Sequence, residues 1–161
     1  MTWYEAYSAR LHEFSVPAWE DIPDLGLYMD QVITYLERLL RPLFGDTRRI
    51  VTSSMINNYV KGGLVARPVG KKYDRRQIAQ LVMLCSLKQA LSLEDMRKLM
   101  TPPAGQGIEE VYRTFCGQIE QVSEELSSTL DSQTPLRCAV LSAAYGLLCE
   151  EILGTEISET P

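Results

Sequence analysis

The spacing of apolar side chains along the chain predicts a protein built almost entirely of helices. Residues 2–14 have a helical pattern, and residues 27–44 place apolar side chains every three or four positions, as on one face of a helix. The proline-rich segment 15–26 is expected to separate these two helices. Gly45 and Asp46 are expected to end the second one.

A short helix and a turn are predicted near the middle of the chain. The polar run 52–54, Thr-Ser-Ser, suits a helix N-terminus, and the glycine pair 62–63 is expected to end that helix at Lys61. Residues 64–73, which we call the wing segment, alternate weakly between apolar and polar types and contain a proline and a glycine. The wing segment therefore predicts a small two-stranded β turn.

Two more helices are expected after the wing segment. Asp74 is a suitable N-cap for residues 75–91, whose apolar side chains form a stripe, and Ser92 is a suitable N-cap for residues 93–100. The next segment, TPPAGQG, has the composition of a linker.

The C-terminal part of the chain predicts two longer helices. The first has apolar residues spaced 4-3-4-3-4, the repeat of a coiled-coil-like seam. The second begins at Pro135, ends near Leu153 and is apolar on nearly all sides, so we expect it inside a helical hairpin or between subunits. The seam residues are Ile108, Tyr112, Phe115, Ile119, Val122 and Leu126.

Composition narrows the class of protein. The chain of 161 residues is 45% apolar and 23% charged, as expected for one soluble globular domain. Its first residues lack the pattern of a signal peptide, and its longest apolar run, 138–149, is too short to span a bilayer, so we expect a cytoplasmic protein that does not enter the membrane. The four cysteines are expected to be buried, and with His12 as the single histidine we expect no metal site.

Charge divides the chain into three unequal parts. The net charge is −5 overall, but it is −4 for residues 1–45, +7 for residues 46–100 and −8 for residues 101–161. A positive field confined to one part of an acidic protein can steer a polyanion to that part. The middle of the chain is therefore the first candidate for a binding surface.

A capped short helix, a glycine turn, a basic wing and a further helix are the layout of a winged helix-turn-helix. An α-helix fits the major groove of DNA, where asparagine can form two hydrogen bonds with adenine. Lysine and arginine side chains beside it neutralise phosphates and set the register. In this interpretation Asn57 and Asn58 face the bases, and the helix of residues 53–61 is the recognition helix.

Other residues of this region are expected to contact the DNA backbone. Ser53 and Ser54 lie at the start of the recognition helix, where amide N–H groups favour a phosphate. Tyr59 is expected to dock the helix on the core, although its hydroxyl is also a candidate phosphate ligand. The expected phosphate contacts are Lys61, Arg67, Lys71, Lys72, Arg75 and Arg76.

Plainer interpretations of these residues stay open. Neighbouring asparagines before two glycines also help to end a helix, and a basic cluster is often only a solvated surface. Eight basic residues against one acidic residue between Arg48 and Arg76 favour contact with nucleic acid in an acidic protein. Arg75 and Arg76 at the start of a helix oppose its dipole, a cost that a nearby anion would offset.

The order of residues in 52–100 follows a pattern seen in DNA-binding proteins. An aromatic and a basic residue close the short helix, Gly-Leu follows, a tyrosine closes the wing, and two helices come next. In this order the segment resembles the DNA-binding domain of the MerR family of bacterial regulators, which implies a winged helix-turn-helix and a dimer formed by a long helix after it. The MerR family has an arginine and an aromatic where this chain has Asn57 and Asn58, and this wing is shorter, so base recognition is expected to differ. The matching residues are Ile56, Tyr59, Lys61, Gly63, Leu64, Tyr73, Ile78, Leu81 and 93–96.

Three other stretches point to a narrower family. These are LYMDQV at 27–32, MINNYVK at 55–61 and KKY at 71–73. With them, most of the chain resembles the uncharacterised bacterial family called domain of unknown function 1836. That family has no established activity, so the resemblance implies a fold more than a function.

The sequence thus predicts an all-α, MerR-like winged helix-turn-helix protein with a small β wing and a C-terminal helical hairpin. We expect a DNA-binding transcriptional regulator that binds double-stranded DNA as a homodimer through residues 108–153. The expected parts are an N-terminal helix and connector at 1–23, the winged helix-turn-helix domain at 24–100, a linker at 101–107, the hairpin at 108–153 and a loose tail at 154–161.

The same residues leave other classes of function open. In the main alternative the winged helix is a scaffold whose basic face binds an acidic protein, and a partner retained after nuclease treatment would favour it. In a variant of the DNA-binding hypothesis, Tyr112, Phe115, Tyr145 and the cysteines hold a small effector, but core packing is the plainer explanation of these residues. No catalytic motif, nucleophile–base pair or phosphate-binding loop is present, so we expect neither catalysis nor a cofactor.

Overall fold

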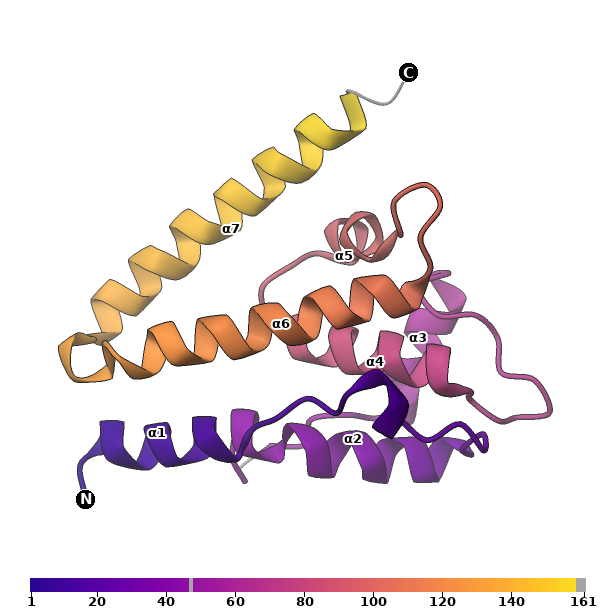
Figure 1. Ribbon diagram of the computed structural model, residues 1–161, viewed down its shortest axis with the longest axis horizontal. Coiled ribbons are helices and arrows are strands. Elements are labelled where there is room, and N and C mark those ends of the chain that lie inside the picture. The colour runs from indigo at the N-terminus through magenta and orange to yellow at the C-terminus, as the bar shows by residue number, and fades with distance from the viewer. Residues whose placement is uncertain (47, 159–161) are drawn as a thin grey trace.

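The computed structural model describes residues 1–46 and 48–158, and it confirms a mainly helical protein (Figure 1). No strand occurs among those residues, and each predicted helix is present within a few residues of its expected bounds. The elements are α1 (Trp3–Glu13), the 3-10 turn η1 (Trp19–Asp21), α2 (Met29–Phe44), α3 (Ser53–Lys61), α4 (Arg75–Leu87), α5 (Leu93–Met100), α6 (Ile108–Ser127), the 3-10 turn η2 (Leu130–Ser132) and α7 (Pro135–Ser158).

The core is centred on α4, which lies between α2 and α6 (Figure 1). Its side chains Ile78, Leu81 and Val82 are fully buried, as the apolar stripe predicts. Helix α6 packs along α4, and its Tyr112 is fully buried with its hydroxyl donating a hydrogen bond to the carbonyl of Pro17 at 2.8 Å. Residues before and after the linker expected at 101–107 therefore share one hydrophobic core.

Side-chain caps fix where the central helices begin. At α4 the Asp74 carboxylate accepts a hydrogen bond from the Gln77 N–H at 3.0 Å, and the Gln77 side chain accepts one from the Asp74 N–H at 2.7 Å. At α5 the Ser92 hydroxyl accepts from the Asp95 N–H at 3.1 Å. Both caps were predicted from the sequence, and they fix the starts of the two helices that follow the wing segment.

The wing segment differs from its prediction. Instead of a two-stranded β turn it forms a loop with two isolated antiparallel bridges, Val69 with Lys72 and Leu27 with Tyr73. The ladder does not extend into strands, because the N–H and carbonyl of the next residue, Tyr73, form hydrogen bonds with Leu27, outside the wing segment. The tip of the wing segment is consequently held by its turn rather than by a sheet.

The two C-terminal helices follow one another but open as a V (Figure 1). The end of α7 packs against α5, whereas its first turn lies beside the end of α6 at the vertex of the V. Helix α7 continues to Ser158, beyond the end expected near Leu153, because the glycine at 154 is not followed by a proline until residue 161. The last three residues of the expected tail, 159–161, lie outside the described residues.

The four cysteines differ in burial, although all four were expected to be buried. Cys85 is fully buried in α4, where burial raises the pKa of its thiol to about 12. Cys116 and Cys149 are half-buried, but Cys138 on the first turn of α7 is exposed, so its expected burial was wrong. The reason is that α7 has few neighbours near its start.

Candidate nucleic-acid interface

Helix α3 presents one polar face and one apolar face. The Thr52 hydroxyl caps its start by accepting a hydrogen bond from the Met55 N–H at 3.2 Å. Ile56 and Tyr59 point into the core, with exposed fractions of 0% and 6%. The opposite face is exposed and consists of Ser53, Ser54, Asn57, Asn58 and Lys61. These positions follow the i, i+4 spacing of a single helical face, so the structure brings the predicted base-facing residues together.

The C-terminus of α3 depends on a left-handed glycine. Gly63 has φ +73°, and after it the Leu64 N–H donates to the Tyr59 carbonyl at 2.9 Å. Arg97 of α5 donates a further hydrogen bond to the Gly62 carbonyl. Helix α3 is therefore held at this end by α5 as well as by its own turn.

Replacing Gly63 by alanine should lower the free energy of unfolding by about 1 kcal/mol, because a side chain disfavours positive φ. A Cβ atom there would meet no atom within 4 Å, so the cost comes from the backbone alone. The matched control is Gly117→Ala, which also meets nothing within 4 Å but lies inside α6. Urea unfolding should show Gly63→Ala destabilised and Gly117→Ala unchanged or more stable, and equal effects would contradict this explanation.

A carboxylate from α2 fixes the segment that leads into α3. One oxygen of Glu37 accepts hydrogen bonds from the N–H groups of Ile50 and Val51 at 2.8 and 2.9 Å. Its other oxygen pairs with Arg41, whose guanidinium also donates to the Arg48 carbonyl at 2.9 Å. Because Ile50 and Val51 are buried, these hydrogen bonds satisfy amide groups that water cannot reach.

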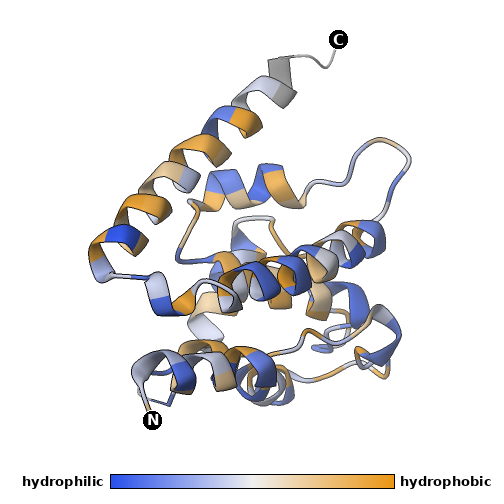
Figure 2. Ribbon diagram, turned by 60° about the vertical axis from the view of Figure 1, so that its left-hand side comes forward, coloured by the Kyte–Doolittle hydropathy of each residue, from blue (hydrophilic) through white to orange (hydrophobic). Residues whose placement is uncertain are grey.

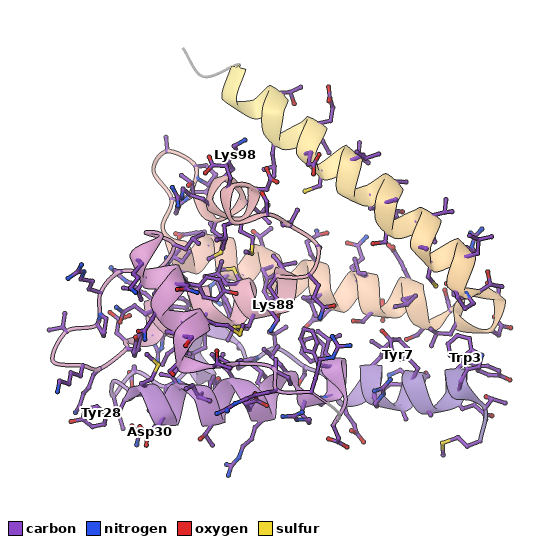
Figure 3. All side chains as sticks on the ribbon, turned by 180° about the vertical axis from the view of Figure 1, so that it is seen from behind. Trp3, Tyr7, Tyr28, Asp30, Lys88 and Lys98 are labelled. Carbon is purple, nitrogen blue, oxygen red and sulfur yellow. The ribbon has the colours of Figure 1, made fainter. Side chains whose placement is uncertain are left out.

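Lys88 holds the same segment from the side of α4. Its ammonium donates a hydrogen bond to the Ile50 carbonyl and lies 5.6 Å from the ring centre of Phe44 (Lys88 is labelled in Figure 3). Both backbone groups of Ile50 thus have a hydrogen-bond partner: its N–H donates to Glu37, and its carbonyl accepts from Lys88. The start of α3 is consequently set by contacts from α2 and α4 together.

The wing segment is anchored at its base and free at its tip. Leu64 and Val65 are buried, and the Gln77 side-chain amide donates to the Ala66 carbonyl at 3.0 Å. At the tip, Gly70 and Lys71 both have positive φ, 57° and 63°, as a tight hairpin turn of the primed type requires. Lys71 therefore holds a backbone conformation that side chains disfavour, and its own side chain is exposed.

The far side of the wing segment is tied to the chain before α2. Leu27 and Tyr73 exchange two backbone hydrogen bonds of 2.9 and 2.8 Å. The Lys72 ammonium lies 5.2 Å from the ring centre of Tyr28, which Figure 3 labels beside the wing segment. The wing segment thus has a fixed base, while its basic side chains remain at the surface.

Two of the residues predicted to contact DNA do not lie on the exposed surface with the others. Tyr59 is packed in the core, where burial raises the pKa of its hydroxyl to about 12, so it docks α3 as expected and does not reach the outer face. Arg75 turns towards the N-terminal connector, donating to the Ile22 carbonyl at 3.0 Å and pairing with Asp24 at 3.3 Å. Its guanidinium holds residues 20–24 against α4 and is not presented with the other basic groups.

The remaining predicted contacts are exposed. Views from front and back place α3 and the wing segment next to each other at one end of the molecule, with α3 behind α4 in Figure 1 and before it in Figure 3. Within the described part of the chain none of their basic side chains forms an ion pair. The exposed basic residues of this region are Lys61, Arg67, Lys71, Lys72 and Arg76.

A second group of arginines lies on the α2 side of this region. Arg38, Arg48 and Arg49 line an open hollow together with Glu37 and Arg41, and all three are exposed. Arg48 and Arg49 belong to the basic cluster of the sequence, but neither was predicted to contact DNA. Their position in the segment before α3 extends the positive surface around the start of that helix.

Two of the three aromatics suggested for an effector site lie side by side, with the ring centroids of Tyr112 and Phe115 6.2 Å apart. Tyr112 lies in the core, Phe115 lines an apolar hollow beside α5, and Tyr145 is exposed on α7. No group of three or more metal-ligating side chains is found in residues 1–46 and 48–158. Nor is any helix in that part of the chain both long and apolar enough to cross a membrane.

Comparison with known proteins gives one match. A family model described as Domain of unknown function (DUF1836) matches residues 17–115, which contain α2 to α5 and the start of α6. Searches of characterised proteins and of solved structures give no match.

Proposed function

The chain belongs to the DUF1836 family, and we propose that it is a DNA-binding transcriptional regulator of MerR-like type. In this proposal α3 enters the major groove of double-stranded DNA, with Asn57 and Asn58 towards the bases. The wing segment lies on the phosphates beside it, as a short form of the wing of a winged helix-turn-helix. The regulator acts inside the cell as a homodimer through residues 108–153 and needs no cofactor.

The observation that supports this proposal best is the composition of the exposed face of α3 and its surroundings. The exposed side of α3 carries hydroxyl, amide and ammonium groups and no carboxylate, a combination that suits contact with bases and phosphates. Five exposed basic side chains extend this face from Lys61 to Arg76. Within the described residues, none of the four acidic side chains of residues 46–100 forms an ion pair with these five basic groups.

The rigidity of the site supports the same function. Base readout needs side chains held within a fraction of an ångström, which is easier on a helix than on a loop. Helix α3 is held at its start by Glu37 and Lys88 and at its end by Arg97. The outer face is therefore preorganised, while the tip of the wing segment can adjust to the backbone of the DNA.

Titration of a labelled random-sequence duplex at two salt concentrations tests this proposal. With about five phosphates neutralised by each protomer of the proposed homodimer, log Kd should rise with log salt with a slope of about 9, or about 4.5 per protomer. Fluorescence anisotropy would measure it on the intact protein. Absence of binding at low salt, or an affinity that salt does not change, would contradict DNA binding by this face.

A further inference from the structure

Helix α7 leaves large apolar side chains in water. Its residues Leu136, Val140 and Leu147 have exposed fractions of 75%, 60% and 69%. Figure 2 shows apolar residues on successive turns of α7 where it stands away from the other helices. A helix that is apolar on nearly all sides is normally buried, so the surface of α7 is incomplete in the single chain.

The predicted seam of α6 does not supply this missing surface. Tyr112 is fully buried, and Phe115 and Ile119 pack against the same core as α4. These seam residues are therefore used within the chain and are closed to a second copy. Any pairing of the C-terminal helices has to involve mainly α7.

The exposed apolar residues of α7 form a stripe of their own. Leu136, Val140, Ala143 and Leu147 follow one another at spacings of 4, 3 and 4, which places them on one face of the helix, and all four are exposed. Leu148, Cys149 and Ile152 lie on the other side and line a hollow with Leu99 of α5. The stripe is therefore an outward face, separate from the contact with α5.

Charged residues beside the stripe indicate what covers it. Arg137 and Glu151 lie on the same flank of the stripe, each seven residues from Ala144. Both are exposed, and within the described residues neither side chain forms an ion pair. Two antiparallel α7 helices that cross at Ala144 would place each Arg137 opposite the Glu151 of the other copy, whereas in a parallel pair these two residues, fourteen positions apart along the helix, would not meet.

We propose that α7 is the dimerisation element and pairs with α7 of a second copy, antiparallel and centred on Ala144. The arrangement is twofold symmetric, because the part of the stripe near the crossing, Ala143 and Leu147, is used by both copies. Small residues at Ala143 and Ala144 let the two helices approach closely at the crossing. The inference gives the proposed dimer a surface and a direction, and it holds whether or not the protein binds DNA.

Charge reversal tests the pairing without DNA. Sedimentation equilibrium of the full chain should show a dimer, and Arg137→Glu or Glu151→Arg alone should raise its dissociation constant about tenfold, since each creates two like-charge contacts. The double variant Arg137→Glu/Glu151→Arg should restore the dissociation constant of the unchanged protein. Glu124→Arg on α6 is the control and should leave it unchanged.

Three results would overturn the inference. A monomer at concentrations of tens of micromolar would show that α7 does not pair. Single reversals without effect would exclude the antiparallel contact, and a double variant as weak as the single ones would exclude the pairing of Arg137 with Glu151. Because these positions are exposed, circular dichroism should show unchanged helix content in every variant.

Discussion

Replacing Glu37 by alanine is expected to lower the free energy of unfolding by about 3 kcal/mol and to weaken DNA binding. The substitution leaves the buried N–H groups of Ile50 and Val51 without an acceptor, and each unsatisfied group costs about 1–3 kcal/mol. It also leaves Arg41 without its carboxylate partner. The segment before α3 would loosen, and the start of the recognition helix with it. Urea unfolding and duplex titration would measure the two effects.

Two controls separate the role of Glu37 from a general loss of charge. Glu37→Gln keeps an oxygen for the two N–H groups but loses the charge, so it should cost roughly half as much as alanine. Arg38→Ala removes an exposed charge from the next position of α2 and should change the stability by less than about 0.5 kcal/mol. If Glu37→Ala is no more destabilising than Arg38→Ala, Glu37 does not hold the entry to α3.

Replacing both Lys71 and Lys72 by alanine is expected to weaken binding to all duplex sequences by at least tenfold. Both side chains are at the exposed tip of the wing segment, where a phosphate contact does not depend on the base sequence. Each lost phosphate contact should reduce the slope of log Kd against log salt by about 0.9, so the double variant should lose about 1.8 per protomer. Anisotropy titrations over a range of salt concentrations would give this slope.

The matched control removes the same charge elsewhere. Arg10 on α1 and Lys98 on α5 are basic residues outside the proposed interface, and Figure 3 labels Lys98 near α7. The Arg10→Ala/Lys98→Ala variant should change the affinity by less than about threefold and leave the salt slope unchanged, because only local contacts release counterions. Equal losses in the two double variants would mean that net charge, and not the wing segment, governs binding.

Local signals in the sequence were sufficient to predict the helices. The cap residues Thr52, Asp74 and Ser92 form the predicted hydrogen bonds, and the glycine pair at 62–63 ends α3 where expected. These signals act over three or four residues, so they can be recognised without knowing the rest of the fold. The outer face of α3 follows from the same helical periodicity.

Long-range contacts could not be predicted in the same way. Glu37 binds a segment thirteen residues away, and Arg97 binds a carbonyl thirty-five residues away, and neither residue stands out from its neighbours in the sequence. Arg75 was assigned to a phosphate because its type fits, but the fold places it beside the carbonyl of Ile22. The exposure of α7 was also not predictable, because an apolar helix that waits for a partner and an apolar helix that is buried in its own chain have the same sequence pattern.

Amide hydrogen exchange with and without duplex DNA tests most directly whether the face formed by α3 and the wing segment binds DNA. The proposal predicts slower amide exchange in residues 62–73 and at the first amides of α3, because bound phosphates and bases would hinder exchange there. It predicts that DNA does not change the exchange of α6 and α7 from that of the dimer alone. Protection confined to α6 and α7, or equal exchange everywhere at saturating DNA, would contradict it.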